Sequence, residues 1–412
     1  MSSLDPEMPE VASPAPSGAP AAAPTLDKYF RAMIKADASD LHIKPGLPPH
    51  IRVHTNIIAA RGAPLTPQQS AQMAYELMDP KQRAYFEERG SIDVAYELEG
   101  SDRFRINIFR QRGLIAIAVR RVTRNIPSFE QLHLPPVMSK IADEHQGLVL
   151  ISGVAGSGKS TTIAAMLDHI NRTRACHILT VEDPIEYLYA PNKSIVSQRE
   201  IGIDVPDFAD ALKYLPREDP DVILIGALRD PEPFQAALKY LMREDPDVIL
   251  IGELRDAETF QAALQASEPG HLVLGTVHAS SSSQTLGRIL DLFHADSRKL
   301  VRQSLSFNLR AIVCQKLMPS IAKGVDRVPG MEVLLTNAVV RQLIEEERDG
   351  ELPDVIRSNE RDGMQTFTRS LLTLIETNYI DPHVAYEVAP NVDELKMLMK
   401  GISASRSGLL SR

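Results

Sequence analysis

Apolar and polar positions alternate differently in successive parts of the chain. Near the start, apolar residues recur at helical spacing, which predicts the core face of a short helix. They are Leu26, Tyr29, Phe30, Met33 and Ile34. From Asp40 to about Val122, short alternating runs predict strands around one helical stretch near Pro67–Met78. This part of the chain is expected to form a small α+β domain.

A second pattern begins at Gly147. Continuous apolar runs, typical of buried parallel strands, alternate with amphipathic stretches to about Met318, and mainly helical patterns continue to about Met399. This order predicts an α/β domain. The expected division is a disordered Pro- and Ala-rich tail at 1–24, the small domain at 25–125, a linker at 126–140, the α/β domain at 141–400 and a flexible tail at 401–412.

The run GVAGSGKST at Gly153–Thr161 carries the clearest chemical signal. It fits G-x-x-x-x-G-K-[ST], with a candidate strand before it and a candidate helix after it. Backbone N–H groups then wrap phosphates, Lys159 reaches the β- and γ-phosphates, and Ser160 holds Mg²⁺. We predict a nucleoside triphosphate site; the alternative is a glycine-rich turn that binds nothing. Its binding residues would be Gly153, Val154, Ala155, Gly156, Ser157, Gly158, Lys159, Ser160 and Thr161.

Carboxylates and histidines lie at the ends of the next apolar runs. The segment EDPIEY places Glu182 and Glu186 where ligands bind in open α/β sheets, although a helix cap and turn is the alternative. Glu253 ends a DVILIG run and could contact a metal or orient water, or be a solvated strand end. His271 and His278 bracket the run LVLGTV; they are candidates for sensing a γ-phosphate or are satisfied polar groups.

An arginine cluster lies in the small domain, in RFRINIFRQR. Its members are Arg103, Arg105, Arg110 and Arg112. Strand alternation puts Arg103 and Arg105 on one face, with Arg110 at the strand end. On local charge alone, a solvated basic face is the simpler interpretation.

Composition narrows the classes of function. A net charge of −9, a pI near 5.7 and the lack of a basic stripe argue against nucleic-acid binding as the main role. Cys176 and Cys314 are too few for a disulfide framework or a four-cysteine zinc site, so we expect reduced thiols. No apolar run reaches the roughly 18 residues that span a bilayer, and the start lacks a signal pattern. We expect a cytoplasmic protein without a transmembrane segment that could dock on a membrane complex.

Together these motifs resemble one family. ASDLHI, GVAGSGKST, EDPIEY, DVILIGELRD and GHLVLGTVH occur in the order and near spacing of the secretion-type hexameric ATPases, over roughly residues 25–400. The chain is most similar to type IV pilus retraction ATPases of the PilT/PilU type, because it lacks the long N-terminal extension and the tetracysteine insertion of assembly and type II secretion relatives. FRQRG at Phe109–Gly113 and DGMQTF at Asp362–Phe367 resemble the accessory, PilU branch.

This resemblance implies a PAS-like domain followed by a RecA-like ATPase domain, in a homohexamer peripherally associated with the inner membrane at the pilus base. It implies ATP and Mg²⁺ as cofactors, with a paralogous retraction ATPase and an inner-membrane pilus platform protein as partners. The residues it implies are Lys159 and Ser160 as the Walker A pair, Glu182 and Glu186 as the acidic box, Glu253 as catalytic base and Mg²⁺ contact (directly or through water), His271 and His278 as the histidine box, and Arg105 and Arg110 for charge stabilisation.

One departure from the family concerns a C-terminal motif. The primary retraction motor has AIRNLIRE, whereas this chain has VVRQLIEE at Val339–Glu346, with Glu345 where an arginine is expected. The swap inverts a charge and favours the accessory role. The first expectation is therefore an ATP-hydrolysing retraction motor of the accessory kind. The alternatives are a pilus-assembly or type II secretion ATPase, and a hydrolysis-defective ring subunit acting through a paralogous motor.

The second departure is a tandem repeat. Residues 211–236 recur at 237–262, whereas the family has one such unit. Spacing from the acidic box puts Ala227 at the catalytic position, and spacing from the histidine box puts Glu253 there. We predict that only one DVILIG strand lies in the sheet beside the phosphate-loop strand, and that the second copy takes this place because Pro216 would break the helix before the first. The first copy, with a helix capped by Asp230, is then expected at the sheet edge or surface.

Overall fold

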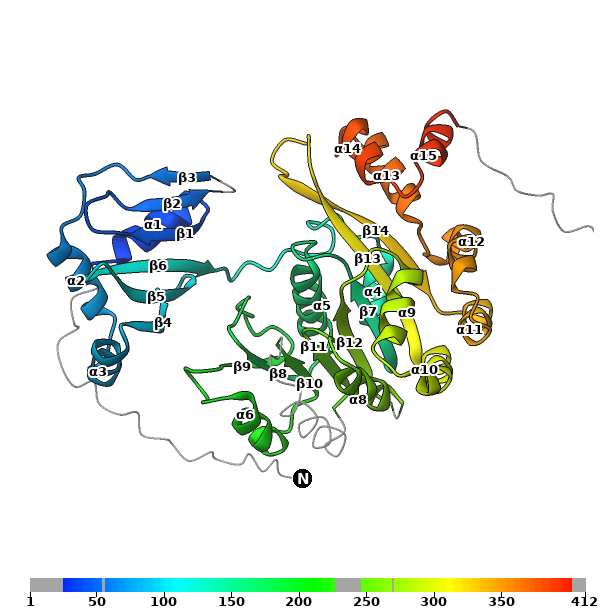
Figure 1. Ribbon diagram of the computed structural model, residues 1–412, viewed down its shortest axis with the longest axis horizontal. Coiled ribbons are helices and arrows are strands. Elements are labelled where there is room, and N and C mark those ends of the chain that lie inside the picture. The colour runs from blue at the N-terminus through cyan, green and yellow to red at the C-terminus, as the bar shows by residue number, and fades with distance from the viewer. Residues whose placement is uncertain (1–24, 54–55, 227–245, 269, 402–412) are drawn as a thin grey trace, which may run out of the picture. The chain divides into compact units, whose positions relative to one another are not determined.

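The computed structural model describes residues 25–53, 56–226, 246–268 and 270–401, without the side chain of Pro216. The chain divides between Arg121 and Val122 into two compact units, each with its own core (Figure 1). The predictions for residues 1–24 and for the C-terminal tail lie outside the described residues.

The smaller unit is built on a six-stranded sheet in its described part, in the order β3-β2-β1-β6-β5-β4. Its core contains the stripe predicted near the start, with Phe30 and Met33 fully buried against Phe104 and other strand residues. The strands are β1 (Ala38–Ile43), β2 (His50–Val53), β3 (Asn56–Ala59), β4 (Ser91–Glu97), β5 (Arg103–Gln111) and β6 (Leu114–Val122), and the helices are α1 (Asp27–Lys35), α2 (Pro67–Glu76) and α3 (Pro80–Arg89).

Helix α3 was not predicted, because it lacks an apolar stripe: Phe86 is its buried residue. Its end signals were nevertheless present in the sequence. Asp79 caps the first turn through a capping box with Gln82, and Gly90 adopts a left-handed conformation at the C-terminal end. Helix signals at both ends can therefore outweigh a missing periodicity.

The larger unit contains, among the residues that the structure describes, an eight-stranded sheet in the order β14-β13-β7-β12-β11-β10-β8-β9. Its neighbours from β13 to β9 pair in parallel, and β14 is antiparallel to β13. The strands are β7 (Gly147–Ser152), β8 (His177–Glu182), β9 (Ile195–Glu200), β10 (Val222–Ile225), β11 (Val248–Ile251), β12 (Leu272–Val277), β13 (Leu309–Pro319) and β14 (Arg327–Leu335). The predicted α/β fold is confirmed. β14 lies in the part of the chain after Met318 where mainly helical patterns were expected, so this strand was not predicted.

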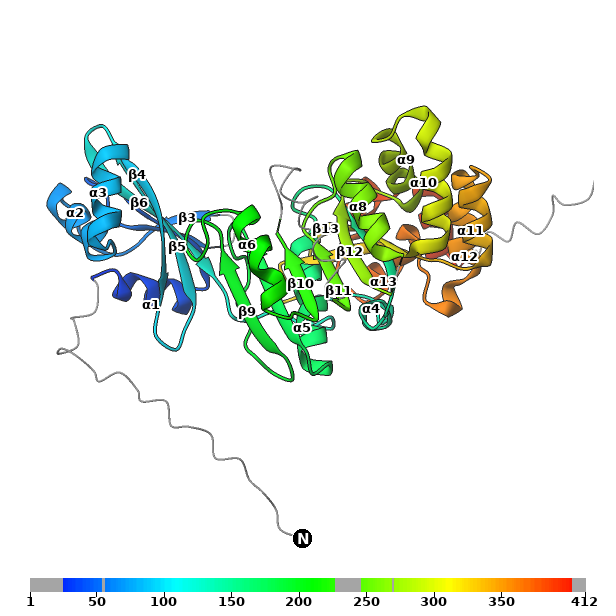
Figure 2. The same cartoon turned by 90° about the horizontal axis from the view of Figure 1, so that it is seen from below.

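Helices cover both faces of this sheet, which explains why its parallel strands read as continuous apolar runs. One face packs against α4 (Val137–Ala142) and α5 (Lys159–Thr173). The other face packs against helices that include α8 (Ala257–Ser267), α9 (Ser282–Asp291) and α10 (Ala295–Asn308) (Figure 2). The remaining helices are α6 (Phe208–Tyr214), α11 (Ala338–Glu345), α12 (Leu352–Ser358), α13 (Phe367–Glu376), α14 (Pro382–Val388) and α15 (Val392–Met399).

The strands of both repeat copies lie inside the sheet, so the prediction that the strand of one copy is displaced to an edge or surface was wrong. β10 pairs with β8 on one side and with β11 on the other, and β11 pairs with β12. Neither strand lies beside β7, because β12 separates them. The physical reason is that both strands carry the sequence VILI and are buried along their whole length, so each fits an interior position.

Pro216 did not keep the first copy out of the sheet. Helix α6 ends at Tyr214, a short 3₁₀ turn covers Leu215–Arg217, and the chain still enters β10. The predicted helix capped by Asp230 lies outside the described residues, as does Ala227.

Candidate functional site

The phosphate loop connects β7 to α5, as the motif predicted. Gly153 and Gly158 have φ values of 157° and 92°, which side-chain-bearing residues rarely adopt. A Cβ on Gly153 would also lie 2.5 Å from the carbonyl oxygen of Gln315. Because α5 begins at Lys159, its first-turn N–H groups lack intrahelical partners and face the end where an anion binds.

Lys159 is folded back onto this loop. Its Nζ donates to the carbonyl oxygens of Gly153, at 2.7 Å, and Val154, at 3.3 Å. Burial lowers the pKa of Lys159, whereas the charge of Glu253 raises it. The ammonium group can exchange these two carbonyl oxygens for phosphate oxygens. The hydroxyl of Ser160 is exposed at the start of α5, so the residues present fit a nucleotide phosphate and its Mg²⁺.

Glu253 lies just beyond β11, where it contacts the side chains of Arg255 and His278. Its Oε1 is 2.8 Å from Nε2 of His278, and its Oε2 accepts a hydrogen bond from Arg255. Burial alone would raise the pKa of Glu253, but the hydrogen bond and charge of Arg255, together with His278 and Lys159, lower it below its usual range. Glu253 is therefore an ionised acceptor, able to orient a water molecule. The structure thus brings together Lys159, Glu253 and His278 from three separate motifs.

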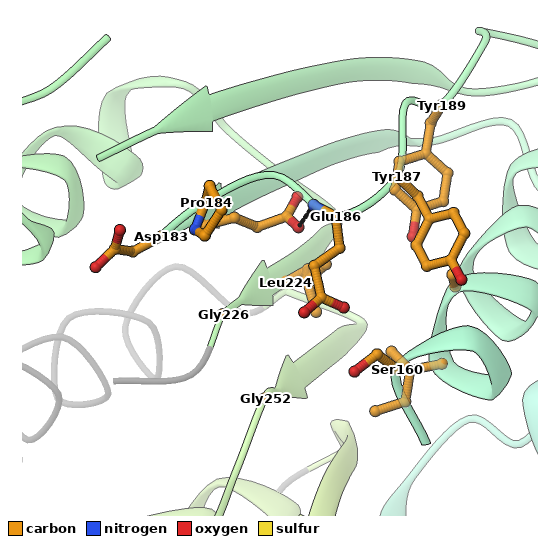
Figure 3. A pocket seen from close by; sticks show the side chains of 12 residues that line it. Ser160, Asp183, Pro184, Glu186, Tyr187, Tyr189, Leu224, Gly226 and Gly252 are labelled. Atoms are coloured by element: carbon orange, nitrogen blue, oxygen red, sulfur yellow. Dashed lines mark hydrogen bonds between the residues drawn. The ribbon is translucent and has the colours of Figure 1, made fainter. Parts of the chain in front are cut away.

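The acidic loop follows β8, as predicted, but its carboxylates differ in environment. Glu182 is 6 % exposed; its Oε1 accepts from Thr180 at 2.8 Å and its Oε2 accepts from the backbone N–H of Glu186 at 3.2 Å. Burial raises the pKa of Glu182 to about 7. Glu182 therefore shapes the loop. The carboxylate of Glu186 instead points toward the side of the pocket where Ser160 lies, whereas that of Asp183 points away (Figure 3).

A cavity of about 110 Å³ connects this loop with the first turn of α5. Ser160, Glu186, Gly226 and Gly252 all line it. The hydroxyl groups of Thr161 and Tyr187 are 2.8 Å apart and hold the acidic loop against α5. The cavity therefore reaches Ser160, the residue that the motif predicts to hold Mg²⁺, from the acidic side.

One predicted residue of the larger unit does not lie here. His271 precedes β12 and is 2 % exposed; its carbonyl oxygen accepts from the N–H of Gly147, at the start of β7. His271 is therefore at the opposite end of the strand from His278. The arginines belong to the smaller unit, where Arg105 shares a face of β5 with Arg103, and Arg110 forms an ion pair with Glu87 of α3.

Sequence reasoning missed Gln315 on β13. Its Nε2 donates to the carbonyl oxygen of Ser157 at 2.7 Å, and its Oε1 accepts from Thr162 at 2.9 Å. Gln315 is 4 % exposed, so it joins the phosphate loop to the first turn of α5 inside the protein. The available signal was a lone amide in the apolar run of the strand.

Comparison with known proteins agrees with this geometry. A family described as type II/IV secretion system protein matches residues 19–237 and, separately, 232–397, so the two matches overlap around the junction of the two repeat copies. The chain is 38 % identical to the type IV pilus retraction ATPase PilT of Pseudomonas aeruginosa, over 86 % of this chain and 95 % of PilT. It is 35 % identical to the type IV pilus ATPase PilU of the same organism, over 94 % of each chain.

A solved structure shows the same fold. The crystal structure of the pilus retraction motor PilT with bound ADP matches with a TM-score of 0.73 at 38 % identity, covering 90 % of this chain and 98 % of that one. In the described part of the chain, no helix is both long and apolar enough to cross a membrane. The chain belongs to the family of type II/IV secretion system proteins, and the type IV pilus retraction ATPase PilT and the type IV pilus ATPase PilU are its homologues.

Proposed function

We propose that this protein is an ATP-hydrolysing motor subunit for pilus retraction. The observation that carries the proposal is the meeting of Lys159, Glu253 and His278 beside a phosphate loop, at the carboxyl ends of parallel strands. The similarity to PilT and PilU over most of the chain supports the retraction role. ATP is the proposed nucleotide, since the homologous PilT was solved with ADP.

The proposed roles follow from the environments of the side chains. Lys159 holds the β- and γ-phosphates, and Glu253, kept ionised by Arg255 and Lys159, orients the attacking water. Ser160 and Glu186 flank the place for Mg²⁺, which would neutralise charge on the phosphates. His278 holds Glu253 in position. The arginines of β5, foremost Arg105 and Arg110, are proposed to stabilise charge in the transition state within an assembled ring.

The accessory role rests on the region around Glu345. The hydroxyl of Ser306 on α10 donates to Oε1 of Glu345 on α11 at 2.7 Å. On the next turn of α10, Arg302 binds both the Ile344 carbonyl oxygen and the Asp349 carboxylate. The glutamate at the family's arginine position is thus used to join two helices. We propose an accessory subunit of a homohexamer, acting with a paralogous retraction ATPase and a platform protein at the pilus base.

Steady-state ATP turnover of the purified full chain tests this function. Lys159→Ala should abolish turnover, because no other side chain of the loop supplies a charge to the phosphates. Lys193→Ala, at an exposed lysine outside the loop, should leave turnover unchanged. Turnover in Lys159→Ala equal to that of the parent would place hydrolysis elsewhere. Retraction in a strain lacking the paralogue then separates an independent motor from an accessory one.

A second candidate is a ring subunit that binds ATP but hydrolyses it poorly. The observation in its favour is β10, which lies between the strand of the acidic loop and the strand of Glu253. Tight binding of nucleotide with no turnover in the parent chain, and restored retraction only when a paralogue is present, would support this candidate over the first.

A further inference from the structure

The repeat places two copies of one strand in the middle of the sheet, aligned residue for residue. Val222 pairs with Val248, and the alignment continues through Ile225 and Ile251, so each residue lies beside its own copy. Both strands are buried from end to end. β10 therefore presents to β11 the same side chains that β11 presents to β12.

This strand pair changes the distance between two parts of the site. The acidic loop with Glu186 follows β8, and Glu253 follows β11, with β10 between them. Neighbouring strands lie about 4.8 Å apart, so β8 and β11 are separated by about 10 Å instead of one strand spacing. A chain with one copy of the strand would bring the acidic loop about 4.8 Å closer to Glu253.

The edge of β10 provides no replacement for Glu253. Gly226 donates its N–H to Val181 of β8 at 2.8 Å, and Gly252 donates in the same way to Ile225 of β10, also at 2.8 Å. The two glycines line the same cavity as Ser160. In the sequence, however, Gly252 is followed by Glu253 and Gly226 by alanine. The inserted strand therefore widens the site without adding a carboxylate.

We propose that β10 is a spacer strand that holds the acidic loop away from Glu253 and so slows ATP hydrolysis, and that excision of either copy re-forms the sheet. The proposal rests on the ATPase function proposed above. Catalytic groups must be placed closely, since a misplacement of about 1 Å can cost about 10²-fold in rate. A displacement of one strand spacing is several times larger.

The sequence explains why excision should be tolerated. The copies differ only at Pro216/Met242, Ala227/Glu253, Pro231/Ala257 and Pro233/Thr259. With residues 211–236 removed, the strand of the second copy would pair with β8 in the same register and with the same four residue types as β10. The apolar core contacts of the strand would also be kept, because its faces are identical.

Two matched deletions test the proposal. Removal of 211–236 keeps Glu253, whereas removal of 237–262 is the same length and keeps Ala227 instead. The second deletion combined with Ala227→Glu restores the carboxylate. For each full-length-derived variant we would measure thermal unfolding by circular dichroism, affinity for a fluorescent ADP, and kcat and KM for ATP.

The proposal expects both deletions to fold and to bind ADP. Removal of 211–236 should raise kcat at least about tenfold over the parent, with a smaller change in KM. Removal of 237–262 should abolish turnover, and Ala227→Glu should restore it in that background. This rescue distinguishes a placement effect from a general gain in stability.

Three results would overturn the proposal. One is a parent chain that turns over ATP as fast as the chain lacking 211–236. Another is unfolding of both deletions, since interchangeable copies must each fill the gap. The third is failure of Ala227→Glu to rescue. If neither the parent nor any variant hydrolyses ATP although all bind ADP, the proposed ATPase function itself fails, which is a separate outcome.

Discussion

Replacing Gln315 with methionine tests how the phosphate loop is held in shape. Methionine keeps the length and volume of the side chain but cannot form the hydrogen bonds to Ser157 and Thr162. The Ser157 carbonyl oxygen would then lose a buried partner, which costs about 1–3 kcal/mol. Thr162 can turn its hydroxyl toward the carbonyl oxygen of Gly158, one turn earlier. Losing the hydrogen bond between Thr162 and Gln315 should therefore cost only about 1 kcal/mol. We expect a total loss of stability of about 2–4 kcal/mol.

Part of this loss should appear in nucleotide binding, because the loop must be re-ordered when it wraps the phosphates. Each 1.4 kcal/mol spent on re-ordering weakens affinity about tenfold. Urea unfolding followed by circular dichroism measures the stability, since the chain has no tryptophan for fluorescence. Affinity for fluorescent ADP measures how well the loop still wraps the phosphates. Gln342→Met, at an exposed glutamine of α11, is the matched control and should change neither quantity.

A double variant tests whether the hydrogen bonds act as one unit. Thr162→Val removes one partner of Gln315, so the costs of Thr162→Val and Gln315→Met should not add when the two are combined. If Gln315→Met loses less than about 0.5 kcal/mol and binds ADP like the parent, the bridge from β13 does not support the loop.

Three further predictions concern the carboxylates and arginines. Glu253→Gln should keep ADP binding but lower kcat by about 10²–10⁴-fold, as expected for loss of a general base, and parent-like kcat would move that role to the acidic loop. Burial raises the pKa of Glu182 to about 7 from 4.5, so the folded state favours its protonated form; this stabilisation is present at low pH and is lost as pH rises through about 7. Relative to Glu182→Gln, the parent should lose about 3 kcal/mol of stability from pH 4.5 to above 7, and parallel pH profiles would contradict the shift. Alanine at one or more of the four arginines should lower kcat more than ADP affinity. The control is Glu87→Ala, which breaks the ion pair of Arg110 but keeps the arginine. Normal turnover in all four arginine variants would show that the cluster is only a solvated basic face. These four are Arg103, Arg105, Arg110 and Arg112.

The sequence predicted those parts of the molecule that depend on local pattern. The phosphate loop, the strand ends that carry Glu182 and Glu253, and the alternation of arginines in β5 all follow from short-range spacing. The place of the first repeat copy did not follow, because strand order is set by packing between distant segments. Identical VILI sequences fit adjacent interior positions, and no local pattern excludes this arrangement.

The roles of individual side chains were harder to predict than their positions. Glu182 and Glu186 belong to one short motif, yet the carboxylate of Glu182 is hydrogen-bonded within its own loop, whereas that of Glu186 points toward the side of the cavity where Ser160 lies (Figure 3). The contribution of Gln315 depends on β13, which lies more than a hundred residues after the phosphate loop. Such contacts arise only when the sheet has assembled.

Two identical neighbouring strands also give the folding chain a choice that a single-copy relative does not face. While the sheet assembles, either copy can pair with β8 or with β12, because the four paired side chains are the same. The wrong assignment keeps nearly all apolar contacts and differs mainly in the order of the connecting segments. Near-equal alternatives of this kind make a landscape rougher and prolong the life of misassembled states. The repeat therefore makes correct assembly depend on connection order more than on strand sequence, and we expect this chain to refold more slowly than a chain with one copy.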